Sequence, residues 1–454
     1  MKAEQKENRP ASSRRTALEA LRRVEYGDGY SNLVLDAALK RAGLSPADSA
    51  LASALFYGVL ERRITLDSYL QGLIKGKASP YLRDCLRLGL YQILYMDKVP
   101  DAAAVHETVE LVKASKESRA AGLCNAVLRQ AIRRKATLLP PQGDTPAAVG
   151  VRYACPAWLA QNLIGDYGLP AAEAFLADAL NPPPVYIRAN TLRTTADALL
   201  DTLVQQGIEA EAGPLPGSIR LRAPGSLEGN PLYKQGLFHV QDLASQYCAA
   251  LVDPRPGERV LDLCAAPGGK SFTLAQRMGD AGVLISCDIH PKRVGLIRQG
   301  AERLGITCLS ACQNDAGIWN PALLEAGAAV PAPFDRVLCD VPCSGFGIIR
   351  RKPDVKYKEP DSLKGLPALQ LTILENGSRY VKPGGRLVYS TCTLRRAENQ
   401  KVCGRFLKAH PEFAAEAVPG MASACADDPP GFYTFMPHTH GSDGFFAAVF
   451  RRKA

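Results

Sequence analysis

The sequence lacks the long apolar runs of a membrane protein. None of its 454 residues belongs to an apolar stretch as long as the roughly 18–20 residues that a membrane-spanning helix needs. The start of the chain, from Met1 to Pro10, is polar and has no apolar core of a signal peptide. With 46% hydrophobic and 22% charged residues, the composition is typical of a soluble globular protein. We therefore expect a cytoplasmic protein without a membrane partner.

Paired cysteine spacing is also missing. The 13 cysteines are an odd number, they are scattered, and several lie in apolar runs. This pattern fits a reducing compartment better than a disulfide framework. No cluster of cysteine and histidine has the spacing of zinc ligands, so we expect no metal. For Cys287, Cys308 and Cys339 we expect buried thiols that pack as small hydrophobic groups.

The most distinctive loop of the chain follows neither common phosphate-binding pattern. An apolar run ends in Asp262, small residues and glycines lead to Lys270, and helix-like sequence follows. The loop is neither GxGxxG nor GxxxxGK[ST], which disfavours a dinucleotide or triphosphate. A strand, a tight loop and a helix N-terminus still form a place for a cofactor at the carboxyl end of a sheet. The acidic strand end predicts a nucleoside-bearing ligand that is poor in phosphate.

Residues 14–135 have a helical pattern almost throughout. Ser45-Pro46 and Ser79-Pro80 are typical helix starts, with a capping serine and proline in the first turn. Leucines and other apolar residues recur behind them at spacings of three and four, which predicts a compact all-α domain. We expect residues 1–13 to be a disordered tail.

The positive charge is concentrated in this helical segment. The whole chain carries a formal charge of +10, and residues 14–135 hold 20 Lys and Arg against 13 Asp and Glu. Seven of the ten surplus charges therefore lie there. A basic domain attached to a near-neutral remainder indicates a polyanion such as nucleic acid. A solubilising surface is the alternative, and charge alone does not decide between them.

The rest of the chain changes pattern twice. Residues 136–150 form a proline-rich polar linker, and residues 151–245 predict a small α+β module with strands at 185–190 and 218–222. From residue 246 strands and helices alternate, with strands expected at 259–264, 283–288, 336–340 and 386–390. Such alternation predicts a parallel sheet with helices on both faces.

Carboxylates and thiols gather where these strands end. Asp262, Asp288 and Asp340 each close a predicted strand, at the sheet edge where ligands bind, although Asp is also an ordinary turn former. Cys343 lies in a polar loop just after the predicted strand 336–340, and Cys392 lies in a polar loop just after the next one, 386–390. Thiols in such loops can ionise and act as nucleophiles. We therefore expect both cysteines beside the loop that ends in Lys270.

These motifs resemble those of the Nop/Sun family of RNA 5-methylcytosine methyltransferases. The segments that carry the resemblance are Asp262–Lys270, Asp340–Gly345, Ser390–Thr393 and Glu398–Asn399. Small departures are Val341, where the family often has alanine or proline, and Gln400, where an acid is usual. No catalytic group is lost.

The helical part is similar to the NusB RNA-binding domain. Asp101–Glu107 and Gly122–Arg129 carry this similarity, which extends the resemblance over residues 14–453. It implies the subgroup of the family that methylates small-subunit (16S) ribosomal RNA. The implied fold is multi-domain: an all-α NusB-like RNA-binding domain, a small α+β RNA-binding module at 151–245, and a C-terminal α/β Rossmann-like class I methyltransferase domain at 246–454.

The resemblance also implies the chemistry. A methyl group passes from S-adenosyl-L-methionine to C5 of a cytosine, with Cys392 as the nucleophile that adds to C6. Cys343 assists release of the adduct, and Asp340 contacts the cytosine and lies near the transferred methyl. Asp288 is implied to bind the ribose hydroxyls and Asp315 to face the adenine amine. The implied loop contacts to the methionine part come from Cys264, Ala265, Ala266, Pro267, Gly268, Gly269 and Lys270.

A basic run follows the Cys343 loop. We expect its members to track the RNA backbone, although a solvated charge run is the alternative. We expect the protein to be a monomer that binds ribosomal RNA. The residues are Arg350, Arg351, Lys352, Lys356 and Lys358.

Three other functions stay open on the sequence. A tRNA 5-methylcytosine methyltransferase would share every catalytic motif, and only the NusB-like domain favours ribosomal RNA. A DNA cytosine methyltransferase would use the cysteine after proline, Cys343, and would not need Cys392. A NusB-like RNA-binding or antitermination factor without catalysis would need neither thiol.

Overall fold

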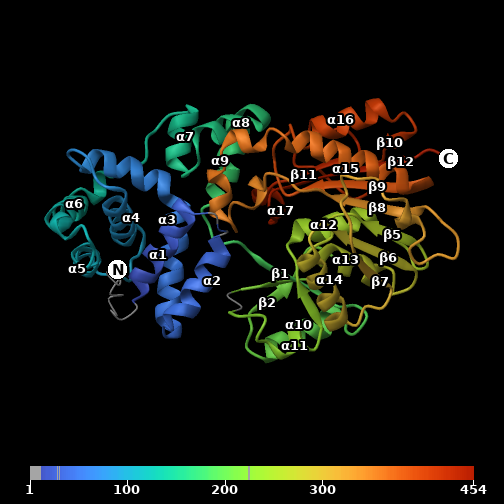
Figure 1. Ribbon diagram of the computed structural model, residues 1–454, viewed down its shortest axis with the longest axis horizontal. Helices are drawn as coiled ribbons and strands as arrows, with labels where there is room; N and C mark the ends of the chain where they lie inside the picture. Colours follow the sequence, from blue (N-terminus) through green and yellow to red (C-terminus); the bar gives the residue numbers. More distant parts are fainter. Residues whose placement is uncertain (1–11, 28, 30, 223–224) are drawn as a thin grey trace, which may run out of the picture. The chain divides into compact units, whose positions relative to one another are not determined.

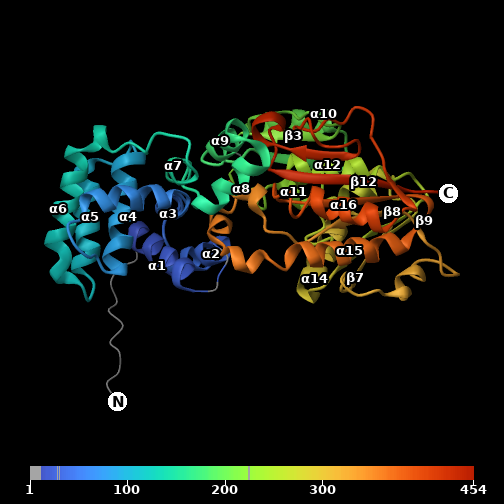
Figure 2. The same ribbon diagram turned by 90° about the horizontal axis from the view of Figure 1, so that it is seen from above.

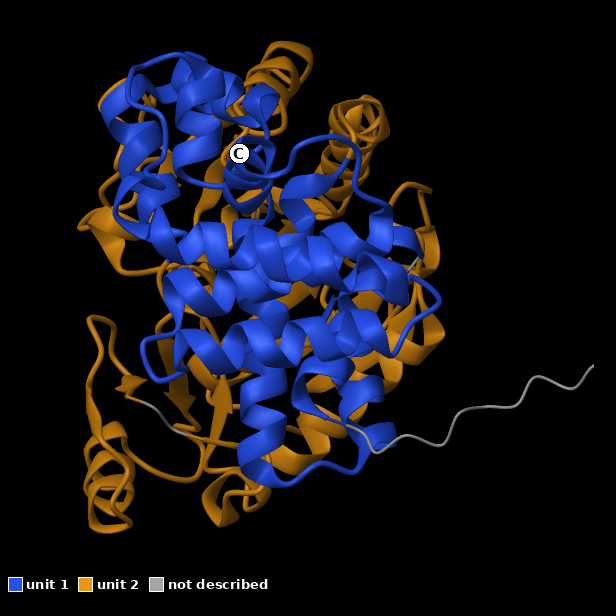
Figure 3. Ribbon diagram, turned by 90° about the vertical axis from the view of Figure 1, so that its left-hand side faces the viewer, with its two compact units in different colours: residues 1–180, 351–358 blue, residues 181–350, 359–454 orange. Residues whose placement is uncertain are grey.

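The computed structural model describes residues 12–27, 29, 31–222 and 225–454. The chain forms two compact units, which Figure 3 colours separately. Unit 1 contains residues 1–180 and 351–358, and unit 2 contains residues 181–350 and 359–454. The expected disordered tail lies outside the described residues except for Ser12 and Ser13, which cap and begin the first helix. Among the described residues, no helix combines the length and apolarity needed to span a bilayer.

Unit 1 is helical, as predicted (Figure 1). The Ser45 and Ser79 hydroxyls accept hydrogen bonds from the backbone three residues later, and Pro46 and Pro80 occupy the first turns, so both predicted helix starts are confirmed. Apolar side chains from these helices form one buried core. The helices are α1 (Ser13–Tyr26), α2 (Ser31–Ala42), α3 (Pro46–Leu73), α4 (Pro80–Tyr95), α5 (Asp101–Lys113), α6 (Ala121–Arg133), α7 (Pro146–Arg152), α8 (Ala157–Tyr167) and α9 (Leu169–Asp178), with 3-10 turns η1 (Ser118–Ala120), η2 (Lys135–Thr137) and η5 (Pro353–Tyr357).

A buried arginine joins three helices of this unit. Arg87 of α4 lies 2.7 Å from carboxylate oxygens of Asp67 and Glu25 and 2.9 Å from Asp84. Burial, reinforced by Glu25, raises the pKa of Asp84 to about 6. Because each carboxylate faces a guanidinium, the buried charges are compensated and hold α1, α3 and α4 in register.

Unit 2 begins with a small antiparallel sheet in the order β2-β3-β1-β4. The predicted strands are confirmed as β1 (Val185–Ala189) and β3 (Ser218–Leu221). β2 (Ala210–Ala212) and β4 (Phe238–Val240) were not predicted, because three residues are too few for an alternation pattern. α10 (Ala196–Gln205) packs on this sheet and α11 (Pro231–Lys234) lies beside β4.

The main sheet of unit 2 has the strand order β10-β12-β9-β8-β5-β6-β7, and β11 pairs with β12. The four predicted strands are confirmed as β5, β6, β8 and β9, and they are parallel to one another. The prediction of a parallel sheet is wrong for the strands beyond β9. β12 runs antiparallel to β9, and β10 and β11 run antiparallel to β12. The strands are β5 (Arg259–Asp262), β6 (Val283–Asp288), β7 (Leu309–Gln313), β8 (Phe334–Asp340), β9 (Val381–Thr391), β10 (Phe413–Ala415), β11 (Phe432–Phe435) and β12 (Phe445–Arg452).

Helices cover both faces of this sheet (Figure 1 and Figure 2). α15 and α16 share an apolar core with one face, and α12, α13 and α14 share another with the opposite face. The sheet is therefore buried on both sides, which explains its continuous apolar strands. The remaining elements are α12 (Leu243–Val252), α13 (Gly269–Arg277), α14 (Pro291–Leu304), α15 (Leu366–Tyr380), α16 (Gln400–Ala409) and α17 (Pro437–His440), with η3 (Pro321–Leu324), η4 (Phe346–Ile348) and η6 (Pro360–Leu363).

Candidate active site

Strand order brings three predicted loops to one edge of the main sheet. β5, β8 and β9 are neighbours and parallel, so the loops after them leave from the same edge. Asp340 at the end of β8 is the register partner of Ser390 in β9. The expected gathering of the small-residue loop, Cys343 and Cys392 in one place is therefore observed.

The two loop cysteines are in direct contact. The Sγ atoms of Cys343 and Cys392 lie 3.2 Å apart, and both side chains are only partly buried. The hydrogen bond from the Cys343 thiol lowers the pKa of Cys392 more than burial raises it. The same bond, together with burial, raises the pKa of Cys343 well above that of an ordinary thiol. The pair is thus asymmetric, because the lower pKa belongs to Cys392 and the higher one to Cys343.

An ion pair lies beside the thiols. Lys270 Nζ donates to Asp340 Oδ2 at 2.7 Å and to Ser245 Oγ at 3.3 Å, and Ser390 Oγ donates to Asp340 Oδ1 at 2.7 Å. Burial alone would lower the pKa of Lys270, but Asp340, Cys248 and Asp262 together outweigh it and raise that pKa. Lys270 therefore stays charged, and its charge favours the Cys392 thiolate.

The small-residue loop is shaped to leave backbone exposed to a ligand. Gly268 has a φ of 112°, and a Cβ there would lie 2.4 Å from the Phe272 ring, so only glycine fits. Ala265 N donates to the Cys287 carbonyl at 2.7 Å, which fixes the loop on β6. α13 begins at Gly269, so its free backbone N–H groups face the loop.

Acidic groups lie at or just after the carboxyl ends of three neighbouring strands, β5, β6 and β7. Asp262 is fully buried, and its Oδ1 has no protein partner, while burial raises its pKa to about 7. Asp288 is also buried and pairs with Arg293 at 3.1 Å. Asp315 is exposed, and its Oδ1 accepts from Gly317 N at 2.8 Å. The cations beside the loop, Lys270 and Arg293, are paired with Asp340 and Asp288, so this donor set suits a positively charged ligand better than a phosphate.

The basic residues after Cys343 differ in their surroundings. Arg350 donates to the Asn181 and Pro182 carbonyls, whereas Lys358 is exposed. Lys356 is 3% exposed, its Nζ donates to the Glu61 carbonyl at 2.6 Å within unit 1, and burial lowers its pKa to about 8. The expectation that Lys356 tracks an RNA backbone is therefore replaced by a packing role.

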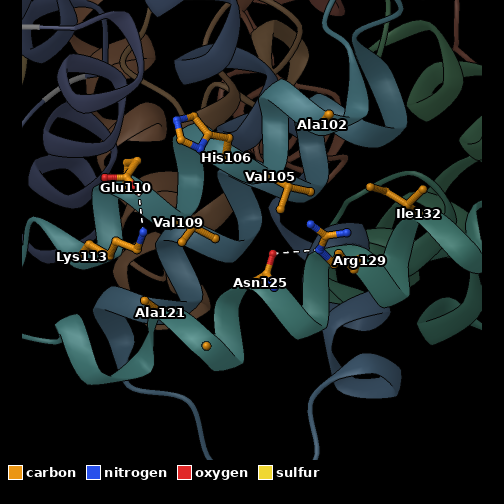
Figure 4. Close-up of a pocket in the computed structure, with 11 residues that line it drawn as sticks. Ala102, Val105, His106, Val109, Glu110, Lys113, Ala121, Asn125, Arg129 and Ile132 are labelled. Carbon is orange, nitrogen blue, oxygen red and sulfur yellow. Dashed lines mark hydrogen bonds and ion pairs between the residues drawn. The ribbon is translucent and has the colours of Figure 1, made fainter.

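Unit 1 contains a groove of about 520 Å³ between α5 and α6 (Figure 4). Its lining includes His106 and Asn125, from the two stretches that resemble a NusB domain. The cations on its rim are engaged: Lys113 donates to Glu110 at 2.8 Å, and Arg129 donates to the Asn125 side chain at 3.1 Å.

Sequence reasoning assigned no role to several buried groups around the thiols. Glu398 appeared only as part of a motif, and Gln370, Ser344 and Thr393 were not singled out, yet all four are buried there. The expected buried role of Cys287 and Cys339 is confirmed, but Cys308 is only half-buried. Across the part of the chain that the structure describes, no three His, Cys, Asp or Glu side chains are grouped to hold a metal ion.

Three family models match the chain in order. The NusB family matches residues 11–133, the RsmF/B-like ferredoxin-like domain matches residues 155–228, and the 16S rRNA methyltransferase RsmB/F matches residues 249–451. The first match lies on unit 1, the second runs from α8 through β3, and the third covers the main sheet from β5 to β12. Together with the sheet topology, these matches define a methyltransferase with a helical NusB-type domain ahead of it.

Relatives extend the similarity over the whole chain. A probable ribosomal RNA small subunit methyltransferase B of Bacillus subtilis (strain 168) is 38% identical over 451 residues, covering 97% of this chain and 99% of the relative. The protein of the same description in Synechocystis sp. is 34% identical over 453 residues, with the same coverage. A crystal structure of PH0851 has a TM-score of 0.79 and 25% identity, covering 97% of this chain and 98% of that one. The chain belongs to the RsmB/F family of 16S rRNA methyltransferases.

Proposed function

We propose that this protein transfers a methyl group from S-adenosyl-L-methionine to C5 of a specific cytosine in small-subunit (16S) ribosomal RNA. The observation that carries the proposal is the asymmetric thiol pair, Cys343 and Cys392, next to Asp340 at the carboxyl edge of the sheet. Cytosine C5 is a poor nucleophile. A thiolate that adds to C6 makes C5 an enamine carbon able to take the methyl group.

Each group at the edge has one task in this reaction. Cys392 bonds to C6 as the thiolate, and its lowered pKa supports that role. Asp340 hydrogen-bonds the cytosine edge and supports protonation at N3 during the attack. After methyl transfer a base removes the C5 proton. The bond between C6 and the Cys392 sulfur then breaks, and its electron pair returns to the sulfur. Cys343, as the protonated partner of Cys392, assists this release.

The cofactor supplies an electrophilic methyl group on a sulfonium. We assign its methionine part to the loop from Cys264 to Lys270, its ribose hydroxyls to Asp288 and its adenine amine to Asp315. The buried, unpartnered oxygen of Asp262 and the glycine-only turn at Gly268 support a ligand at this loop. The acidic surroundings support a cationic one.

The RNA substrate rests on the helical unit and on the relatives. The surplus of seven positive charges in residues 14–135 and the family names support ribosomal RNA. The target base must leave its stack to reach Cys392, and we assign backbone contacts to Arg350, Arg351, Lys352 and Lys358. We further propose a cytoplasmic monomer with domain limits at 14–135, 151–245 and 246–454.

The test is a map of 5-methylcytosine in RNA from cells with and without this protein, read by mass spectrometry. We expect a single 16S cytosine to lose its methyl group in the deletion and to regain it on complementation. Loss from a tRNA with unchanged ribosomal RNA would favour the tRNA enzyme that shares these motifs. Unchanged 5-methylcytosine in both ribosomal RNA and tRNA would contradict the proposal and favour a NusB-like RNA-binding factor without catalysis.

A further inference from the structure

Glu398 is a buried carboxylate whose charge contributes to the raised pKa of Cys343. It lies between β9 and α16 and is fully buried. Its Oε2 accepts from Ser344 N and from Gln370 Nε2, both at 2.9 Å, and its Oε1 accepts from Arg395 at 2.8 Å. A carboxylate only accepts, so it satisfies all three donors at once, and these charge-assisted bonds are stronger than neutral ones.

These bonds hold the backbone on both sides of Cys343. Ser344 follows Cys343, and its N–H is fixed by Glu398. Pro342 precedes Cys343, and its carbonyl accepts from the same Gln370 Nε2 at 3.0 Å. Glu398 and Gln370 therefore form one clamp around the Cys343 loop.

The Cys343 loop is in turn tied to the Cys392 loop. Ser344 Oγ lies 2.8 Å from Thr393 Oγ1, and Gly347 N donates to the Cys392 carbonyl at 2.9 Å. A Cβ on Gly347 would lie 2.8 Å from the Cys392 carbonyl oxygen, so a side chain there would press against the Cys392 loop. The separation of the two thiols thus depends on where the clamp holds Ser344.

We propose that Glu398 is a positioning residue that, with Gln370, sets the separation of the Cys343 and Cys392 thiols. The role in catalysis rests on the proposed function, because it assumes that Cys392 is the nucleophile. Without the clamp, the Ser344 N–H loses its Glu398 acceptor, the backbone around Cys343 shifts, and the Cys343 thiol moves out of hydrogen-bond reach of Cys392. Hydrogen bonding at sulfur weakens steeply with distance and misalignment.

Other charged groups also act on Cys392. Lys270 favours its thiolate, whereas Asp340 and Asp443 oppose it, and the Cys343 thiol is the largest favourable influence. Of these four, Cys343 is the one whose loop Glu398 holds. Removing Glu398 should therefore raise the pKa of Cys392 by no more than removing the Cys343 thiol does.

The experiment measures alkylation of Cys392 by iodoacetamide against pH in the full-length protein, with peptide mass spectrometry as the readout. It needs neither RNA nor cofactor, so a wrong substrate does not affect it. We expect Glu398→Ala and Cys343→Ala each to raise the alkylation midpoint by roughly one pH unit. The double variant should show no additional shift. Glu398→Gln keeps one acceptor oxygen for Ser344 and Gln370, so it should largely retain the wild-type profile.

Glu416→Ala is the matched control. Like Glu398, Glu416 is a carboxylate of unit 2 paired with arginine; it is half-buried and bonds to Arg386 and Arg451. Its removal should leave the Cys392 profile unchanged. A folded Glu398→Ala variant with a wild-type profile, or a shift that adds to that of Cys343→Ala, overturns the proposal. Should Glu398→Ala fail to fold by circular dichroism, Gln370→Met decides: a raised midpoint supports the clamp and an unchanged one overturns it.

Discussion

Lys270 Nζ and Asp340 Oδ2 are 2.7 Å apart although Lys270 lies in the first turn of α13 and Asp340 is the last residue of β8. The pair joins the proposed cofactor loop to the proposed cytosine contact. It also places a positive charge where it favours the Cys392 thiolate. Breaking it should therefore disturb cofactor binding, cytosine contact and nucleophile together.

Lys270→Met tests this coupling. The change leaves Asp340 without its cation and removes the positive charge near Cys392, so we expect the rate of methyl transfer to fall by about 100-fold or more. The measurement is single-turnover transfer of labelled methyl groups to 16S RNA. Lys292→Met is the control, because Lys292 is exposed on α14. Near wild-type activity in Lys270→Met would show that the ion pair has no part in the reaction.

The roles of the two thiols predict opposite outcomes for their alanine variants. Cys343→Ala should accumulate a covalent protein–RNA adduct, because methylation proceeds and release is impaired. Cys392→Ala should form no adduct and have no activity. Denaturing gels that resolve RNA-linked protein give the readout, and Cys425→Ala, a half-buried thiol elsewhere, should behave as wild type. An adduct with Cys392→Ala and none with Cys343→Ala would instead make Cys343 the nucleophile.

Asp262 should make stability depend on pH. Burial raises its pKa from 3.8 to about 7. Between these values the folded carboxyl keeps a proton that the unfolded one loses, so its contribution to stability falls as pH rises. Asp262→Asn should thus raise the unfolding temperature more at pH 8 than at pH 5, by roughly 2–4 °C for each kcal/mol relieved. Equal effects at both pH values would show that Asp262 is ionised throughout.

Asp280 provides the control of opposite sign. Burial would raise the pKa of Asp280, but hydrogen bonds from Cys308 and Thr307 outweigh it and lower that pKa. Its contribution to stability is therefore present above the unfolded pKa and is lost as pH falls. Asp280→Asn should lower the unfolding temperature at both pH 5 and pH 8.

The Arg87 cluster predicts a large loss of stability in unit 1. Arg87→Leu leaves Asp84, which is 3% exposed, with Arg22 as its remaining cation. It also removes the partner of Asp67 and the closer of the two arginine partners of Glu25. Breaking such a buried network should lower the free energy of unfolding by about 3–5 kcal/mol. Hydrogen exchange in α1, α3 and α4 of the full chain measures it. Lys113→Leu breaks an exposed pair and should leave exchange in these helices unchanged.

Much of this fold follows from patterns of polarity. The bounds expected for β6 are those observed, because its apolar run is bounded by a glycine and an aspartate. β7 and β10 escaped prediction, because short edge strands with mixed burial have no clear period. The apolar sequence of β12 is typical of a strand, but it does not indicate that the strand runs antiparallel to β9. That direction depends on how the chain connects the two strands.

The site divides in the same way. Cys343, Cys392 and Asp340 are recognisable from the sequence because strand ends gather at one edge. The clamp is not recognisable, since Gln370 belongs to a helix and meets Glu398 only after α15 packs on the sheet. Lys356 reads as one basic residue among five, and only its packing against α3 reveals that it is buried.

The eight residues 351–358 have a consequence for modularity. They leave unit 2 directly after the Cys343 loop, and within unit 1 the Tyr357 hydroxyl donates to the Leu60 carbonyl at 2.7 Å while Arg63 stacks on its ring at 3.8 Å. No single cut in the chain can therefore divide it into its two units. A fragment ending at Leu180 would lack a piece of its own core, and grafting a different helical unit onto this enzyme would require exchanging two segments of the sequence together.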